Sequence, residues 1–283
     1  MNITKYTELE ELGSGTFGKV FKIKYTGDSI DNLTQNQIYS LKIINLNEES
    51  SKKQIIMEFN LQKPLEHPNI CGVYALYIES DTAYIFMEYI EGIELKKYIE
   101  SQGGKLNEED TKIIFKQIID GINYCFSQQI AHFDIKPENI MIIPSTKQIK
   151  LIDFGEARIH KNVFNNRTKK TTYVPINTEK LGTAKYMAPE LMLKNPKRNS
   201  RADIWSLGVL LYEMLIGARL LPKYILGSWF EQYTYREPKN LTRNYGKLWS
   251  NVKEKEEYTI LSDECKDLLE KMLSSTNVRN RLS

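Results

Sequence analysis

Two short motifs decide the fold of this chain: His132-Phe133-Asp134-Ile135-Lys136-Pro137-Glu138-Asn139 and, shortly after it, Asp153-Phe154-Gly155. The first motif groups a carboxylate, an ammonium group and a carboxamide, and the second adds another carboxylate. Ile140–Ile143 and Ile149–Ile152, which lie between the two motifs, are rich in isoleucine and predict two short strands. Polar side chains are therefore expected in loops that flank a small β-structure.

Toward the N-terminus, Gly13-Ser14-Gly15-Thr16-Phe17-Gly18-Lys19-Val20 is a glycine-rich turn between the predicted strands Glu8–Leu12 and Lys19–Tyr25. Glycines allow backbone amides to approach phosphate oxygens closely. Dinucleotide-binding turns share this spacing, but they continue into a helix. Because a strand follows here, the sequence predicts a hairpin that covers phosphates.

A lysine and a glutamate come next, on separate elements. Lys42 lies in the predicted strand Ile38–Ile44, and Glu58 lies in the predicted helix Glu49–Lys63. A strand lysine usually faces solvent, but Glu58 supplies a partner for this one. Two further strands are predicted at Val73–Ile78 and Ala83–Glu88.

After Gly92 the pattern becomes helical. Asn107, followed by Asp110, predicts the N-cap of a helix whose apolar residues recur on one face as far as Cys125. Residues 156–180 are polar and are interpreted as a loop. Ala202–Ile216 is almost wholly apolar and predicts a helix that is buried nearly all round.

These motifs resemble those of the eukaryotic protein kinase superfamily, of the serine/threonine type with Phe133 before the catalytic aspartate. The resemblance continues in chain order through Gly182–Glu190 and Asp203–Gly208 to Arg281, so it covers essentially the whole chain. It implies an α+β, bilobal protein kinase fold in a single catalytic domain, residues 1–283. A small β-rich N-lobe with one main helix is expected at about residues 1–89, and a larger, mostly helical C-lobe without the last family helix at about 90–283.

The resemblance also implies the chemistry. Phosphoryl transfer has a loose transition state, so catalysis is mostly positioning and charge neutralisation. Asp134 would accept or orient the proton of the acceptor hydroxyl, and Lys136 would neutralise the γ-phosphate of ATP. Asn139 and Asp153 would ligate two Mg²⁺ ions, or Mn²⁺, because oxygen ligands suit hard cations.

For the nucleotide, the resemblance implies that Lys42, oriented by Glu58, holds the α- and β-phosphates. Adenine would lie between Val20 and Met141 and would hydrogen-bond the backbone from Glu88 to Ile90. The other implied ATP-binding residues are Gly13, Gly15 and Gly18, the gatekeeper Met87, and Glu94 near the ribose.

The acceptor class follows from Lys136 and Thr183, which match the serine/threonine pattern; dual specificity stays open. Ala188-Pro189-Glu190 matches the docking segment of kinases with protein substrates, and Glu190 would pair with Arg281. Three acidic residues match positions that select basic residues before the acceptor in related kinases, which makes a basic substrate context a hypothesis. They are Glu94, Glu138 and Glu213.

Phe133 and Glu179 depart from the family pattern. Phe133 replaces an arginine that usually binds a phosphorylated activation loop, and Glu179 stands at the usual phosphorylation site. Together they predict a kinase that is active without loop phosphorylation. The alternative, phosphorylation of Thr171, Thr172, Tyr173 or Thr178, stays open.

Ser40 and Gln62 are further departures. Ser40 replaces the alanine that packs on adenine, and we expect a modest weakening of nucleotide contact. Gln62 stands where the family places an apolar residue, and burying an unpaired amide costs about 1–3 kcal/mol. We therefore expect either that the Glu49–Lys63 helix sits outward until an activating partner binds, or that the match to the family pattern shifts in register near Pro64.

The composition of the chain gives no support for nucleic-acid binding, membrane insertion, secretion or zinc binding. The 283 residues are 41% hydrophobic and 27% charged, with a formal net charge of +3, which gives no argument for nucleic acid. No window approaches the roughly 18 apolar residues of a membrane helix, and the N-terminus has no signal-peptide core, so we expect a cytoplasmic or nuclear protein. Cys71, Cys125 and Cys265 are far apart and predict free, core or near-core thiols, with neither disulfides nor a zinc site.

The main alternative is a pseudokinase scaffold that binds nucleotide or partners without transferring phosphate. It is disfavoured because every residue that transfer requires in the family pattern is present. A small-molecule kinase is disfavoured by the docking segment.

Overall fold

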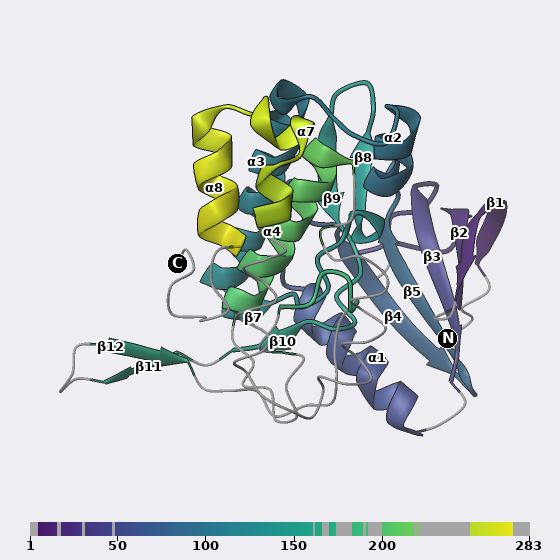
Figure 1. The fold of residues 1–283 in the computed structure, drawn as a ribbon. Helices are drawn as coiled ribbons and strands as arrows, with labels where there is room; N and C mark the ends of the chain where they lie inside the picture. The colour runs from purple at the N-terminus through teal and green to yellow at the C-terminus, as the bar shows by residue number, and fades with distance from the viewer. Residues whose placement is uncertain are drawn as a thin grey trace. The chain divides into compact units, whose positions relative to one another are not determined.

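A computed structural model describes residues 5–15, 18–29, 32–46, 49–160, 162–165, 170–173, 183–188, 191, 200–217, 220 and 250–273. The chain forms two compact units (Figure 1). The first unit comprises Met1–Gly92 and Lys150–Gly155, and the second comprises Ile93–Ile149 and Glu156–Ser283.

The first unit is built on an antiparallel sheet of five strands in the order β1-β2-β3-β5-β4, with one helix, α1 (Glu49–Gln62). The strands are β1 (Tyr6–Gly15), β2 (Gly18–Tyr25), β3 (Ile38–Asn45), β4 (Val73–Glu79) and β5 (Thr82–Glu88). The strands and the helix predicted in this region are therefore confirmed, with bounds that differ by a few residues.

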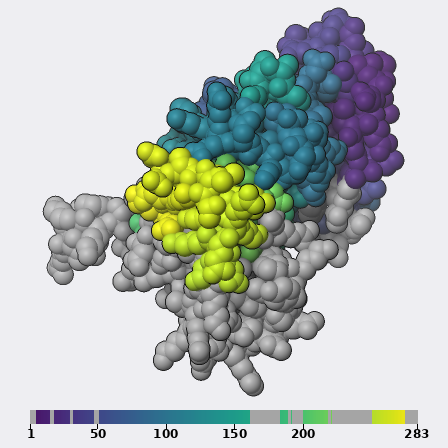
Figure 2. Space-filling view, turned by 45° about the horizontal axis from the view of Figure 1, so that its top comes forward, coloured from purple at the N-terminus to yellow at the C-terminus, as the bar shows by residue number. Residues whose placement is uncertain are grey.

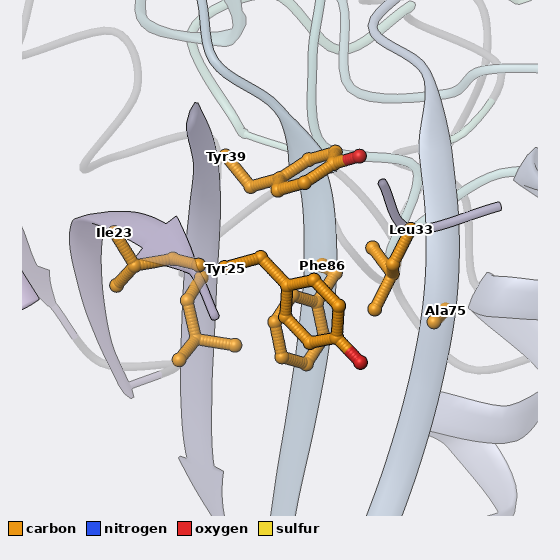
Figure 3. Packing of buried hydrophobic residues seen from close by; sticks show 7 residues of the cluster. Ile23, Tyr25, Leu33, Tyr39, Ala75 and Phe86 are labelled. Atoms are coloured by element: carbon orange, nitrogen blue, oxygen red, sulfur yellow. The ribbon is translucent and has the colours of Figure 1, made fainter. Parts of the chain in front are cut away.

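Each face of this sheet carries its own apolar cluster. Figure 3 shows the aromatic cluster, in which the rings of Tyr25 and Phe86 meet edge to face at 6.0 Å. The other cluster includes Ile44 of β3 and Ile55 of α1. Because side chains alternate along a strand, Lys42 shares the face of Ile44, which is the face against which α1 packs.

The second unit is mostly helical. Its helices are α2 (Leu95–Ser101), α3 (Glu108–Ser127), α4 (Arg201–Ile216), α7 (Glu256–Thr259) and α8 (Asp263–Leu273), with a 3₁₀ turn, η1 (Pro137–Asn139). Its strands are β6 (Ile93–Glu94), β7 (Ile130–Ala131), β8 (Ile140–Ile143), β10 (Arg158–Ile159), β11 (Asn162–Asn165) and β12 (Lys170–Tyr173). A further strand, β9 (Gln148–Leu151), begins in this unit and ends in the first one.

The two long helices agree with their sequence patterns. The side chain of Asn107 accepts a hydrogen bond from the backbone N–H of Asp110 at 2.8 Å, which confirms the predicted N-cap of α3. Nearly all of α4 is buried, as its apolar composition predicts.

The prediction of a loop over residues 156–180 is wrong in part. β10 pairs with β7, and β11 pairs with β12 in an antiparallel hairpin. The pairing partner of β10 lies far away in the sequence, and the hairpin strands are only four residues long. These hairpin strands are mostly polar and lack the isoleucine runs that marked the equally short strands β8 and β9, so no pattern reveals them.

The segment α7–α8 lies on the surface of the second unit, where its atoms are coloured yellow to yellow-green in Figure 2. Glu108, at the start of α3, accepts hydrogen bonds from the backbone N–H of Ser262, at 3.0 Å, and from its hydroxyl. These bonds lower the pKa of Glu108. They fasten the N-terminus of α8 to the N-terminus of α3.

The three cysteines are free, as predicted: Cys71 and Cys125 are buried, and Cys265 is partly buried. Burial raises the pKa of Cys71 and Cys125 to about 12 and that of Cys265 to about 11. All three therefore stay protonated thiols at neutral pH. Within the described residues, no helix has both the length and the apolar character to cross a membrane.

Candidate active site

The loop that carries Asp134 is fastened to helix α4 by Asp203. Both carboxylate oxygens of Asp203 accept backbone N–H groups, from His132 at 2.7 Å and from Phe133 at 2.8 Å. Asp203 is completely buried, and burial raises its pKa to about 7, although the two N–H donors favour the charged form. The motif around Asp203 does not reveal this role in the sequence, because the contact spans about 70 residues.

Phe133 adopts a left-handed backbone, with φ of 60°, and its side chain is only 5% exposed. Such a conformation is uncommon for a bulky residue and persists only where its surroundings hold it. The two hydrogen bonds to Asp203 supply that hold. The aromatic side chain lies in the core, where it offers no charge to a phosphate group.

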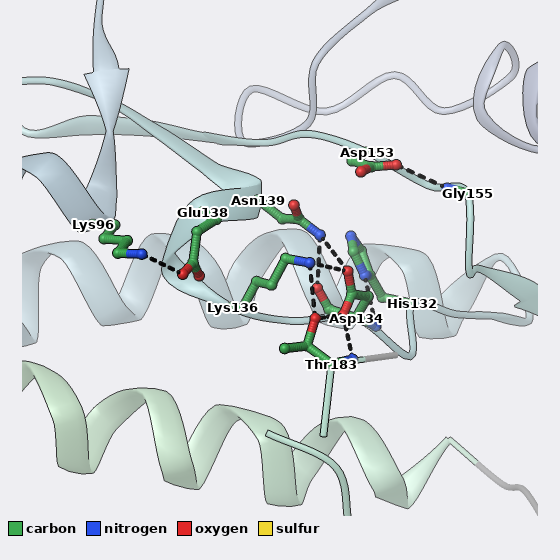
Figure 4. Close-up of polar contacts among 9 residues, drawn as sticks. All are labelled: Lys96, His132, Asp134, Lys136, Glu138, Asn139, Asp153, Gly155 and Thr183. Carbon is green, nitrogen blue, oxygen red and sulfur yellow. Dashed lines mark hydrogen bonds and ion pairs between the residues drawn. The ribbon is translucent and has the colours of Figure 1, made fainter. Parts of the chain in front are cut away.

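Four donors converge on the carboxylate of Asp134 (Figure 4). Oδ1 accepts the backbone N–H and the hydroxyl of Thr183, both at 2.8 Å. Oδ2 accepts the ammonium group of Lys136 at 2.6 Å and the amide of Asn139 at 2.9 Å. Burial acts to raise the pKa of Asp134, but the hydrogen bonds from Lys136 and Thr183 outweigh it, and the pKa is lowered.

The orientation of the Asn139 amide is set by the same loop. Its Nδ2 donates to the backbone oxygen of Asp134 and to the carboxylate of Asp134, both at 2.9 Å. Both amide hydrogens are thereby used, so the side-chain oxygen is the atom that can ligate a cation. The backbone of η1, which begins with Pro137, holds Asn139 in place.

The first unit contains three predicted ATP- and metal-binding residues: Lys42, Glu58 and Asp153. Lys42 Nζ lies 3.7 Å from Glu58 Oε1, and both side chains are largely buried, at 16% and 11% exposure. Asp153 also has a left-handed backbone, with φ of 61°, and its Oδ1 accepts the backbone N–H of Gly155 at 3.2 Å. A Cβ on Gly155 would lie 3.4 Å from Glu58 Oε2. Lys42, Glu58 and the turn that follows Asp153 are thus neighbours.

Two glycines of the β1–β2 hairpin have different physical roles. Gly18 has φ of 118°, and a Cβ there would lie 2.1 Å from the carbonyl oxygen of Ile43, so the fold itself requires glycine. A Cβ on Gly13 would meet nothing within 4 Å. The space next to Gly13 is open, as a phosphate-covering hairpin requires. Gly15 pairs with Gly18 at the tip, and Val20 pairs with Lys42.

The predicted adenine contacts of the first unit lie at the end of β5. Met87 pairs with Ser40, which is buried. The side chain of Glu88 accepts Lys150 at 2.8 Å and the N–H of Gly72 at 3.1 Å. The carbonyl of Ile90 accepts the N–H of Gly92 at 2.9 Å.

In the second unit, Glu94 and Met141 are register partners of β6 and β8, so two predicted nucleotide contacts stand side by side. Thr183 is placed by its bonds to Asp134. Glu190, Glu179 and Arg281, with the pairing predicted for the first and the last, lie outside the described residues.

The cost expected for burying Gln62 as an unpaired amide does not arise. Gln62 is 5% exposed, but its Nε2 donates to the carbonyl oxygen of Cys71 at 3.0 Å. The acceptor is a backbone group nine residues further on, which no side-chain pattern reveals. The expectation of an outward helix loses its physical reason, because the buried amide has a hydrogen-bond partner.

The β-rich unit with its single helix, and the mostly helical unit with its Asp134 loop, define the bilobal protein kinase fold. The chain belongs to the protein kinase family: the family model described as "Protein kinase domain" matches residues 6–283.

Curated relatives agree with this membership. Serine/threonine-protein kinase SAPK9 of Oryza sativa subsp. japonica is 31% identical over 94% of this chain and 65% of its own length. Aurora kinase of Encephalitozoon cuniculi is 33% identical over 73% of this chain and 69% of its own length. Serine/threonine-protein kinase SRK2F of Arabidopsis thaliana is 30% identical over 95% of this chain and 68% of its own length. The chain thus spans about two thirds of the length of these relatives.

Proposed function

We propose that this chain is an ATP-dependent serine/threonine protein kinase, which transfers the γ-phosphate of ATP to serine and threonine hydroxyls of protein substrates. The observation that carries the proposal is the network around Asp134, in which Lys136, Asn139 and Thr183 all bind one carboxylate. The Lys42–Glu58 pair adds the expected phosphate-binding group. The names of the relatives give the same class of enzyme.

Asp134 would act mainly by orientation. A general base is most efficient when its pKa lies near the working pH, and the pKa of Asp134 is lowered instead. Its carboxylate would hold the acceptor hydroxyl in line with the γ-phosphate and would take the proton late. Lys136, at 2.6 Å from this carboxylate, would neutralise the transferring phosphoryl group.

ATP and a divalent cation are what the family uses, and we propose Mg²⁺, with Mn²⁺ as a substitute. The donor set fits: the carboxylate of Asp153 and the free amide oxygen of Asn139 are hard oxygen ligands. The described residues contain no cluster of three or more His, Cys, Asp or Glu side chains. A Mg²⁺ ion that shares its coordination with phosphate oxygens and water needs none. Bound there, the ion would neutralise charge on the phosphates.

The acceptor class would follow from Thr183, whose hydroxyl donates to Asp134 and accepts from Lys136 at 2.9 Å. Lys136 and Thr183 match the serine/threonine pattern of the family, and this contact supports the proposal. Glu190 would complete the docking segment for a protein substrate.

We also propose that substrates carry basic residues before the acceptor. Such a residue would have to compete with lysines of the chain itself. Each of the three candidate acids already pairs with a lysine of its own unit: Glu94 with Lys97, Glu138 with Lys96 and Glu213 with Lys185. A basic substrate residue would have to displace that lysine. A positional peptide library tests the proposal, and equal use of peptides with and without arginine before the acceptor would contradict it.

We further propose that the chain acts as a single catalytic domain, with an N-lobe at about residues 1–89 and a C-lobe at about 90–283, in the cytoplasm or nucleus. An activating partner is retained as a proposal, although the Gln62 amide no longer argues for one. We propose no nucleic-acid ligand. The pseudokinase alternative is not favoured, because no residue of the catalytic set is replaced.

The experiment is transfer of radiolabelled phosphate from ATP to a generic basic protein, followed by phosphoamino-acid analysis. We expect phosphoserine and phosphothreonine with the wild type and no label with Asp134→Asn. Label on tyrosine alone would contradict the acceptor class. Equal label with both proteins would contradict the role of Asp134.

A further inference from the structure

We propose that Gln62 is a positioning residue, whose buried hydrogen bond to Cys71 holds helix α1, and with it Glu58, in place against the strand that leads to Asp153. The roles of Glu58 and Asp153 in this inference rest on the proposed function. The geometry itself does not, because every contact lies within the first unit.

Gln62 is the last residue of α1 and lies four residues after Glu58, so the two side chains project from the same face of the helix. Gln62 is 5% exposed and donates its amide to Cys71 O at 3.0 Å. Glu58, one turn earlier, faces Lys42 of β3. Two anchors one turn apart determine both the rotation and the axial position of the helix.

Cys71 is in turn bonded to the end of β9. Its backbone N–H donates to Leu151 O at 2.9 Å, and Leu151 N–H donates to Asn69 O at 2.8 Å. Ile70 and Leu151 form a parallel bridge between these two bonds. The backbone of Cys71 therefore connects Gln62, through its carbonyl oxygen, with Leu151, through its N–H, and Leu151 precedes Asp153 by two residues.

Beyond Asp153, the chain comes back to helix α1 at Gly155. Gly155 lies so near Glu58 that an added Cβ would stand 3.4 Å from its Oε2. The segment from Leu151 to Gly155 is thus bounded by the backbone of Cys71 at its start and by Glu58 at its end. The family pattern places an apolar residue at position 62. Here the hydrogen bond of Gln62 takes its place, and through Cys71 it joins helix α1 to the end of β9.

Hydrogen exchange measured by mass spectrometry on the full chain tests the link directly. Gln62→Met keeps the length of the side chain but removes the donor, and Gln54→Met, at an exposed position of α1, is the matched control. We expect the amides of Cys71 and Leu151 to exchange about tenfold faster in Gln62→Met. Those of the β4–β5 hairpin should not change, and Gln54→Met should match the wild type. Unchanged exchange at Cys71 and Leu151 would overturn the proposal, whether or not the chain transfers phosphate.

A double-mutant cycle separates positioning from simple packing. If Gln62 acts through Glu58, Gln62→Met lowers kcat/KM for ATP about tenfold in the wild-type background and less than about twofold when Glu58→Gln is already present. An equal loss in both backgrounds would show a structural role only and would overturn the proposal. Absence of any transfer by the wild type would refute the proposed function instead, and the exchange result would then decide the role of Gln62.

Discussion

At the scale of single residues, Asp134 is the centre of the molecule's polar chemistry. Four hydrogen bonds fill the acceptor positions of its carboxylate, and each comes from a residue that the sequence marked as functional or substrate-docking. An acceptor hydroxyl that reaches Asp134 must therefore share or replace one of these donors. The Thr183 hydroxyl is the neutral side-chain donor outside the loop of Asp134 and is the one we expect to be replaced.

The pH dependence of stability follows from Asp134. Its pKa in the folded state is below the ordinary value of 3.8, so the ionised form is favoured by folding. The stability that Asp134 contributes is present above pH 3.8 and is lost as the pH falls through its folded-state pKa. In urea titrations between pH 3 and 7, the wild type should lose free energy of unfolding below about pH 4 more steeply than Asp134→Asn. Parallel curves would contradict this prediction.

Gly13 and Gly18 allow a matched pair of substitutions. Gly18→Ala should destabilise the first unit by about 1–3 kcal/mol, because its backbone is left-handed and its Cβ would meet Ile43 O. Gly13→Ala should change stability by less than about 0.5 kcal/mol, because the space is open. It should instead raise KM for ATP. Chemical denaturation and steady-state kinetics check the two effects, and equal destabilisation by both variants would refute the distinction.

Most residues of the candidate site could be predicted from the sequence, because phosphoryl transfer requires particular side chains at particular spacings. The Lys42–Glu58 pair and the grouping of Asp134, Lys136 and Asn139 are confirmed as contacts, while their roles stay predictions. The partners of Gln62 and Asp203 could not be predicted, since one bonds a backbone carbonyl and the other two backbone N–H groups. Backbone atoms are the same in every residue and leave no pattern in a sequence.

At the scale of elements, helix α4 supports the Asp134 loop through Asp203. Asp203→Asn would leave one of the two loop N–H groups facing an amide nitrogen, and an unsatisfied buried donor costs about 1–3 kcal/mol. We expect a loss of that size in urea denaturation, together with a fall in kcat. Asp267→Asn is the control, because its ion pair with Lys271 is exposed and such pairs contribute at most about 1 kcal/mol. Equal losses in both variants would contradict the account.

The longest helices, the five-stranded sheet and the isoleucine-rich strands β8 and β9 were predicted, whereas the two-residue strands were not. α3 and α4 have caps or apolar runs that extend over several turns, and the five-stranded sheet has alternating strands of at least seven residues. β6, β7 and β10 contain two residues each. Such strands exist because tertiary structure brings their partners together, and a local pattern cannot record that.

At the scale of the whole molecule, two units each carry part of the machinery that the family motifs define. The first holds the glycine hairpin, the Lys42–Glu58 pair and Asp153, and the second holds Asp134 with its partners. Phe133, buried and uncharged, cannot bind a phosphorylated loop as an arginine would. The chain should therefore be active without phosphate on its activation segment.

The most direct test of the central claim is the rate of phosphate transfer from ATP and Mg²⁺ to a protein substrate by phosphatase-treated chain, compared with Asp134→Asn. Loss of a positioned catalytic carboxylate typically costs 10²-fold or more, so we expect the wild type to exceed the variant by at least about 10²-fold. The treated wild type should also keep most of its untreated rate. Equal rates for the wild type and Asp134→Asn would contradict the claim that this chain is a protein kinase that uses Asp134.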